Sequence, residues 1–101
     1  MTEEQINDAV IGIVNEVKRQ LELWGTDFDD KNTANDWAAY IIAYIGKATY
    51  TGRDEVYSPE KFITNMKKAA SLCLSAIFAV KRNGDCAPRH YEKLPRAGAK
   101  N

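Results

Sequence analysis

The sequence predicts an all-α domain of three main helices in a bundle, on the basis of apolar periodicity, helix-end residues and chain length. Apolar residues recur every three or four positions over residues 2–24 and 58–83, the spacing of one helix face, and residues 33–48 are apolar on nearly every side of a helix. Each stretch starts at a Ser or Thr, which favours a helix N-terminus. The 101 residues fit one domain. We expect a helical domain over residues 1–83 and a basic, proline-containing arm over residues 84–101.

The first predicted helix is signalled at both ends. Thr2 and Gln5 match a capping box, and Gly25 follows the last periodic position, where a positive φ often ends a helix. Gly12 inside this helix costs about 1 kcal/mol relative to alanine, so we expect it to mark a close helix crossing. The apolar stripe consists of Ile6, Val10, Ile13, Val14, Val17, Leu21 and Trp24.

Residues 26–32, TDFDDKN, are acidic and lack periodicity, so they are expected to form a loop. Asp27, Asp29 and Asp30 have the oxygen ligands that a hard cation prefers, but their spacing is not that of an EF-hand. A solvated acidic segment before a helix is the favoured interpretation, since acids there complement the helix dipole.

The second predicted helix starts at another capping box, Thr33 and Asp36, and runs to Ala48. It is apolar on nearly every side, so it requires more than one neighbour to cover it. Its aromatic residues have two interpretations, stacking on a base or packing in the core, and helical spacing favours the core. With about 80 ordered residues, three helices form a marginal core. We therefore expect homo-oligomerisation to cover part of this helix.

The third predicted helix follows a connecting loop over residues 49–57. Ser58 is a suitable N-cap, Pro59 suits the first helical position, and Asn83-Gly84 ends the helix. Cys73 falls on the apolar stripe and is expected in the core rather than as a nucleophile. Small residues that allow close helix packing alternate with large ones; they are Ala69, Ala70, Ser71, Ser75, Ala76 and Ala79.

Charge is balanced overall but unevenly distributed. Residues 1–36 hold nine acids and three bases, and residues 81–101 hold six bases and two acids. A basic arm can contact an anion, although a solvated tail is the favoured interpretation. Acids directly after Met1 argue against a signal peptide, and no apolar run approaches the roughly 20 residues that span a bilayer. We expect a cytoplasmic protein, not embedded in a membrane, with Cys73 and Cys86 as free thiols.

Two lysines are the most informative polar residues, because Lys47 and Lys68 lie inside the two most apolar helices. Either both extend their ammonium groups to solvent, or they face a shared cleft and bind an anion. His90, the sole histidine, lies in the arm without a base partner, and we expect no catalytic role for it.

The sequence resembles small MazG-like proteins in the runs DWAAYIIAYIGKA and FITNMKKAASLCLSAIFAV and in EVKRQLELWG upstream of them. Proteins of this kind are often carried by phages or mobile elements and are related to the all-α nucleoside triphosphate pyrophosphohydrolases. The resemblance covers roughly residues 16–80. The family holds magnesium through Glu-Glu-x-x-Glu and Glu-x-x-Asp motifs. Aligned on the Trp and Gly of the first run, those motif positions carry no carboxylate here; they are Ala43, Tyr44, Lys47, Asn65 and Lys68.

This resemblance implies a catalytically degenerate protein that binds a nucleotide or other phosphorylated ligand and does not carry out magnesium-dependent hydrolysis. We expect it to use no metal and no other cofactor. Lys47 and Lys68 would contact phosphate, Asn65 and Tyr44 would lie nearby, and Trp37 would stack on a base. The first alternative is a non-enzymatic oligomeric scaffold whose basic arm or oligomer surface contacts a macromolecular partner; nucleic acid is not expected. The second is a pyrophosphohydrolase that uses displaced acids, namely Glu16, Asp29, Asp30 or Asp36.

Overall fold

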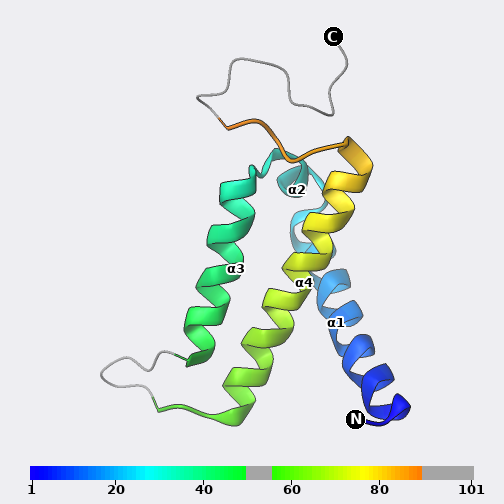
Figure 1. Ribbon diagram of the computed structural model, residues 1–101, viewed down its shortest axis with the longest axis vertical. Coiled ribbons are helices and arrows are strands. Elements are labelled where there is room, and N and C mark those ends of the chain that lie inside the picture. The colour runs from blue at the N-terminus through cyan, green and yellow to red at the C-terminus, as the bar shows by residue number, and fades with distance from the viewer. Residues whose placement is uncertain (50–55, 90–101) are drawn as a thin grey trace.

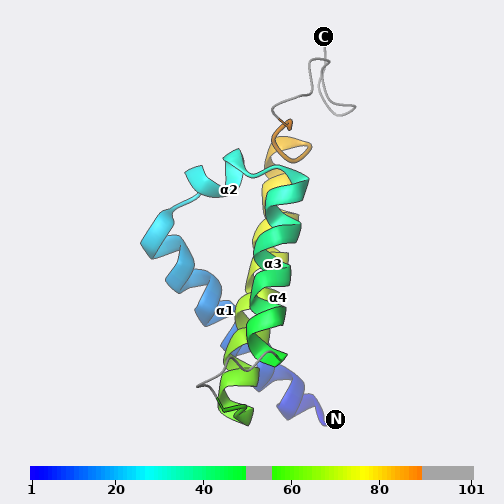
Figure 2. The ribbon, with the colours of Figure 1, turned by 90° about the vertical axis from the view of Figure 1, so that its left-hand side faces the viewer.

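The computed structural model describes residues 1–49 and 56–89, and this part of the chain holds four helices and no sheet. They are α1 (Glu3–Trp24), α2 (Asp27–Lys31), α3 (Ala34–Thr49) and α4 (Pro59–Asn83). The first three all pack against α4, with α3 and α1 on its two sides (Figure 1). A second view shows α1 inclined away from α3, with α2 spanning the gap between the end of α1 and the start of α3 (Figure 2). The all-α prediction is confirmed.

The predicted start and end of α1 are confirmed by hydrogen bonds. Thr2 Oγ1 accepts from the Gln5 amide at 3.1 Å, and the Thr2 amide donates to Gln5 Oε1 at 2.9 Å. At the other end Gly25 has a φ of 66°, and its amide donates to the Leu21 carbonyl at 2.8 Å. A positive φ favours glycine over residues that carry a Cβ.

The predicted N-caps of α3 and α4 are also present. Thr33 Oγ1 accepts from the Asp36 amide at 3.1 Å, and the Thr33 amide donates to Asp36 Oδ2 at 2.9 Å. Ser58 Oγ accepts from the Lys61 amide at 3.0 Å, with proline at the next position. Gly84, left-handed at φ 83°, ends α4. Local hydrogen bonding therefore fixes where each long helix begins.

The expectation of a loop over residues 26–32 was wrong, because Asp27–Lys31 forms the short helix α2. Asp30 Oδ1 accepts from Arg82 Nη2 at 2.5 Å and from Asn83 Nδ2 at 2.8 Å. The hydrogen bond from Arg82 is the main reason that the pKa of Asp30 is lowered. These contacts bind α2 to the end of α4. No local pattern in the sequence predicts them.

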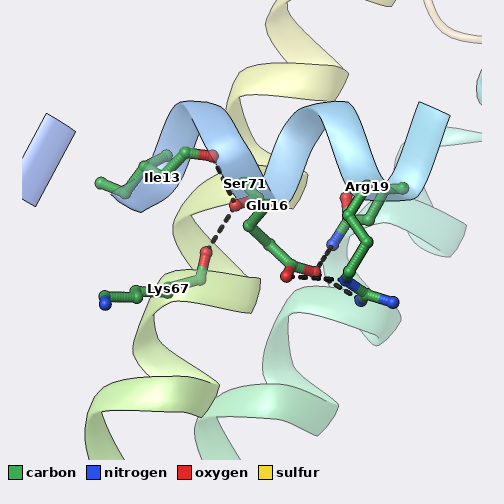
Figure 3. A network of polar contacts seen from close by, with 6 residues as sticks. Ile13, Glu16, Arg19, Lys67 and Ser71 are labelled. Atoms are coloured by element: carbon green, nitrogen blue, oxygen red, sulfur yellow. Dashed lines mark hydrogen bonds and ion pairs between the residues drawn. The ribbon is translucent and has the colours of Figure 1, made fainter. Parts of the chain in front are cut away.

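A close crossing of α1 and α4 occurs at Gly12, as expected. A Cβ at position 12 would lie 3.2 Å from Lys67 Cε. Next to this point the fully buried Ser71 hydroxyl lies 2.7 Å from the Lys67 carbonyl and 3.3 Å from the Ile13 carbonyl of α1 (Figure 3). The small side chain at position 71 thus allows α4 to approach the backbone of α1, whereas at position 12 only the flexible end of the Lys67 side chain is close.

The core of the described chain is small. The buried apolar residues are Trp37, Ala48, Ala69 and Ala79, whereas eighteen large hydrophobic residues are exposed. On α3, Ile42 is 65% exposed and Ile45 43%. Cys73, expected in the core, is exposed, because its side of α4 has no neighbouring helix in a single chain. An apolar stripe identifies a face but not the element that covers it.

The first residues of the arm pack against the junction between α2 and α3. The Ala87 amide donates to the Asn32 carbonyl at 3.0 Å, and Ala87 forms an isolated parallel bridge with Thr33. His90 and the rest of the arm, and most of the expected loop at residues 50–55, lie outside the described residues. By length and hydropathy α4 could cross a membrane, a property shared by core helices of soluble proteins, and 28% of its most apolar window is buried.

Candidate functional site

A pocket of about 350 Å³ opens between the C-terminal end of α1, α2 and one face of α3, with α4 behind it. This volume lies near the lower end of the roughly 300–1,000 Å³ of small-molecule sites. Half of its lining residues are aromatic. They are Trp24, Phe28, Asp29, Asn32, Trp37, Tyr40, Ala43, Tyr44, Lys47 and Leu72.

One end of the pocket is cationic. Lys47 Nζ lies 5.1 Å from the centroid of the Tyr44 ring, and Lys68 Nζ lies 5.7 Å from the same centroid. Lys47 and Tyr44 line the pocket, and Lys68 reaches this ring from α4. Within residues 1–49 and 56–89, neither ammonium group forms an ion pair. Two positive charges thus meet at one aromatic ring.

The carboxylate of Glu16 lies near this cationic end but is engaged by its own helix. Arg19 donates to it through Nε at 2.9 Å and Nη2 at 2.6 Å, and Gln20 Nε2 donates at 3.0 Å (Figure 3). Hydrogen bonding from Arg19 is the main reason that the pKa of Glu16 is lowered, with a smaller contribution from the charge of Lys68. Because Arg19 offsets the charge of Glu16, the two lysines leave this end net positive.

Asn65 and Trp37, both proposed for the site, are buried side chains. Asn65 is buried, and its Nδ2 donates to the Lys61 carbonyl at 2.9 Å within α4, outside the pocket lining. Trp37 lines the pocket but is only 4% exposed, and its buried Nε1 has no hydrogen-bond partner among the described residues. Trp37 therefore offers little ring surface for stacking. The aromatic residues with exposed rings in this pocket are Trp24, Phe28 and Tyr40.

The displaced acids do not gather into a metal site. Asp36 caps α3 and Asp30 is bound to α4, while Asp29 lines the pocket. Among the described residues, no group of three or more His, Cys, Asp and Glu side chains is placed to hold a metal ion. The acids that the alternative enzyme hypothesis requires are thus dispersed.

Sequence reasoning missed the α2 wall of the pocket, formed by Phe28, Asp29 and Asn32. This segment was expected to be a solvated loop because it is acidic and lacks helical periodicity. No local signal placed Phe28 in a pocket wall, because single exposed hydrophobic residues are common on protein surfaces and Phe28 is 62% exposed.

The fold and site thus define an all-α protein with an aromatic pocket that is cationic at one end. No family model, curated protein or solved structure matches the chain.

Proposed function

We propose that this chain is a catalytically degenerate MazG-like protein that binds a nucleotide or other phosphorylated small molecule without magnesium-dependent hydrolysis. The observation that carries the proposal is the placement of Lys47 and Lys68 at the Tyr44 ring, at one end of an aromatic pocket. Lysine binds phosphate as a point charge, and neither ammonium group forms an ion pair within the described part of the chain, the nearby Glu16 being bonded to Arg19.

The pocket suits a ligand with one anionic and one flat apolar part. Phosphate would lie against Lys47 and Lys68, and the ring would extend toward the exposed faces of Tyr40 and Trp24. Magnesium needs oxygen ligands, which lysines do not provide. Binding would therefore proceed without a divalent cation and leave the phosphates intact.

A specific observation also favours self-association, the alternative scaffold function. The exposed Ile42 and Ile45 lie on α3, and Ile77 and Phe78 are exposed on α4. Burying apolar surface contributes roughly 25 cal/mol per Å², so a second copy would supply the core that one chain lacks. We propose that the cytoplasmic form is a homodimer or higher homo-oligomer.

Phosphate binding is tested by thermal melting with ATP, GTP and inorganic pyrophosphate, each with magnesium and with EDTA. A ligand at 100 times its Kd stabilises the folded state by about 2.7 kcal/mol, so the melting temperature should rise equally in both buffers. Lys47→Ala and Lys68→Ala should each weaken binding about tenfold or more, since hydrogen bonds to charged groups contribute roughly 1.5–3 kcal/mol.

The matched control is Lys81→Ala. Lys81 is exposed on the same helix as Lys68, and at 1.5 Å per residue it lies about 20 Å further along. Its removal should leave affinity unchanged. A shift that needs magnesium, or one that survives both pocket mutations, would contradict the proposal.

A further inference from the structure

The pocket has a second polar end, formed by α2. Phe28 and Asp29 are adjacent on this short helix and both line the pocket, with Asn32 following. The hydrogen bonds of Asp30 to Arg82 and Asn83 fix α2 against α4. An aromatic ring and a carboxylate are therefore held together on one wall, while Lys47 lines the α3 side of the same pocket.

The chemistry of Asp29 restricts the class of ligand that the pocket can bind. An ionised carboxylate accepts hydrogen bonds and donates none. Asp29 is only partly exposed, and its burial raises its pKa, with the charge of Arg82 acting in the opposite direction. A half-buried acceptor gains most from a ligand that offers two donors side by side, because both carboxylate oxygens are then satisfied.

Among the standard nucleobases, guanine presents such an edge, with N1–H beside the 2-amino group. Adenine places a donor next to an acceptor there, and the acceptor would face the carboxylate. The exposed rings for stacking are Phe28, Tyr40 and Trp24, at 62%, 50% and 49% exposure. Any base can stack on these rings, so the selection of guanine over the other bases depends on Asp29.

We infer that the α2 end of the pocket selects a guanine-type ring, whose N1–H and 2-amino group donate to Asp29 while Phe28 and Tyr40 contact its faces. The inference rests on the proposed function only for the placement of the phosphate at Lys47 and Lys68. Aromatic rings with a carboxylate also suit an organic cation, but Lys47 lines the same pocket without an ion-pair partner in the described chain and repels one.

The test is titration calorimetry with GMP, IMP and AMP. IMP lacks the 2-amino group, so GMP should bind about tenfold or more tightly than IMP or AMP. Asp29→Asn replaces two acceptors by one acceptor and one donor, so it should abolish the GMP preference and improve AMP binding. Asp27→Asn is the matched control, because Asp27 is exposed on the same helix and does not line the pocket.

Guanosine and adenosine separate this inference from the phosphate site. A guanosine preference over adenosine that is lost in Asp29→Asn supports the inference. If GMP also binds no more tightly than guanosine and loses no affinity when Lys47 or Lys68 is mutated, the proposed phosphate contacts are overturned and the inference stands. Equal affinity for GMP and AMP, with loss on lysine mutation, overturns the inference alone. Choline displacing GMP, or the absence of any nucleotide binding, also overturns it. The GMP and IMP comparison uses the unmodified protein, so the inference stays falsifiable if Asp29→Asn fails to fold.

Discussion

Gly12 of α1 lies against the Lys67 side chain of α4, so that a Cβ at position 12 would come within 3.2 Å of Lys67 Cε. Because Lys67 is exposed, its flexible stem can move by the few tenths of an ångström that an alanine needs. Gly12→Ala should therefore keep most of the alanine helix advantage and stabilise the protein by about 0.5–1 kcal/mol. Urea unfolding measures this change, and a loss of stability would show that the Lys67 stem cannot move.

Ser71 should be the least replaceable small residue at the same crossing. Ser71→Ala removes a buried hydroxyl that bonds to the Ile13 and Lys67 carbonyls and should lower the free energy of unfolding by about 0.5–1.5 kcal/mol. Ser71→Leu should lower it by about 1–3 kcal/mol or more, because the larger side chain separates α1 from α4. Cys73→Ala, on the exposed side of α4, is the control and should change stability by less than about 0.5 kcal/mol.

Local chemistry allowed the ends of the long helices to be predicted. The capping residues Thr2, Thr33 and Ser58 act through neighbours three positions away, so a short window of sequence contains the whole interaction. The helix α2 was missed because its stabilising contact joins Asp30 to Arg82, 52 residues apart. No local window includes both residues.

Part of the candidate site could also be predicted from the sequence. Lys47 and Lys68 stood out because charges inside apolar helices need an explanation, and the structure brings both to Tyr44. Asp29 was considered only as a cation ligand or a catalytic acid, and its position in the pocket wall was missed because α2 was expected to be a loop. The core position expected for Cys73 was wrong, because periodicity assigns a residue to a helix face without showing what covers that face.

The acids Glu16 and Asp30 should give the protein an acid-sensitive contribution to stability. Their folded pKa values lie below the ordinary 4.5 and 3.8, so their stabilisation is complete above those values and is lost as pH falls through the lowered pKa. Asp29, with a raised pKa, acts in the opposite sense. The destabilisation caused by burying its charged carboxylate is present at neutral pH and disappears below pH 3.8.

Urea midpoints measured from pH 3 to pH 7 should therefore separate these acids. Glu16→Gln and Asp30→Asn should each make the loss of stability in acid shallower, and Asp29→Asn should raise stability at neutral pH. High salt should shrink the Asp30 effect, because its ion pair with Arg82 is solvent-exposed. Identical pH profiles for all three variants would contradict the assignment.

Self-association should depend on the exposed apolar surface of α3. Ile42 is 65% exposed and Ile45 43%, and a charge placed within an apolar interface must lose its hydration there. Sedimentation velocity should find the unmodified protein as a dimer or larger at micromolar concentration and Ile42→Glu shifted toward the monomer. Lys18→Gln on the exposed surface of α1 is the control, because it lowers the net charge by one unit, as Ile42→Glu does. A monomeric unmodified protein at every concentration would refute self-association.

The two tryptophans should report separately on the core and on the pocket mouth. Trp37 is 4% exposed and Trp24 49%, so their indole rings differ in contact with water. In Trp24→Phe, the remaining Trp37 emission should be blue-shifted and resistant to iodide quenching. In Trp37→Phe, the remaining Trp24 emission should be red-shifted and readily quenched.

GMP should quench the emission of Trp24 more strongly than that of Trp37, because Trp24 presents the exposed ring to the pocket. Stronger quenching of Trp37 would place the base deeper, against the residue first expected to stack on it.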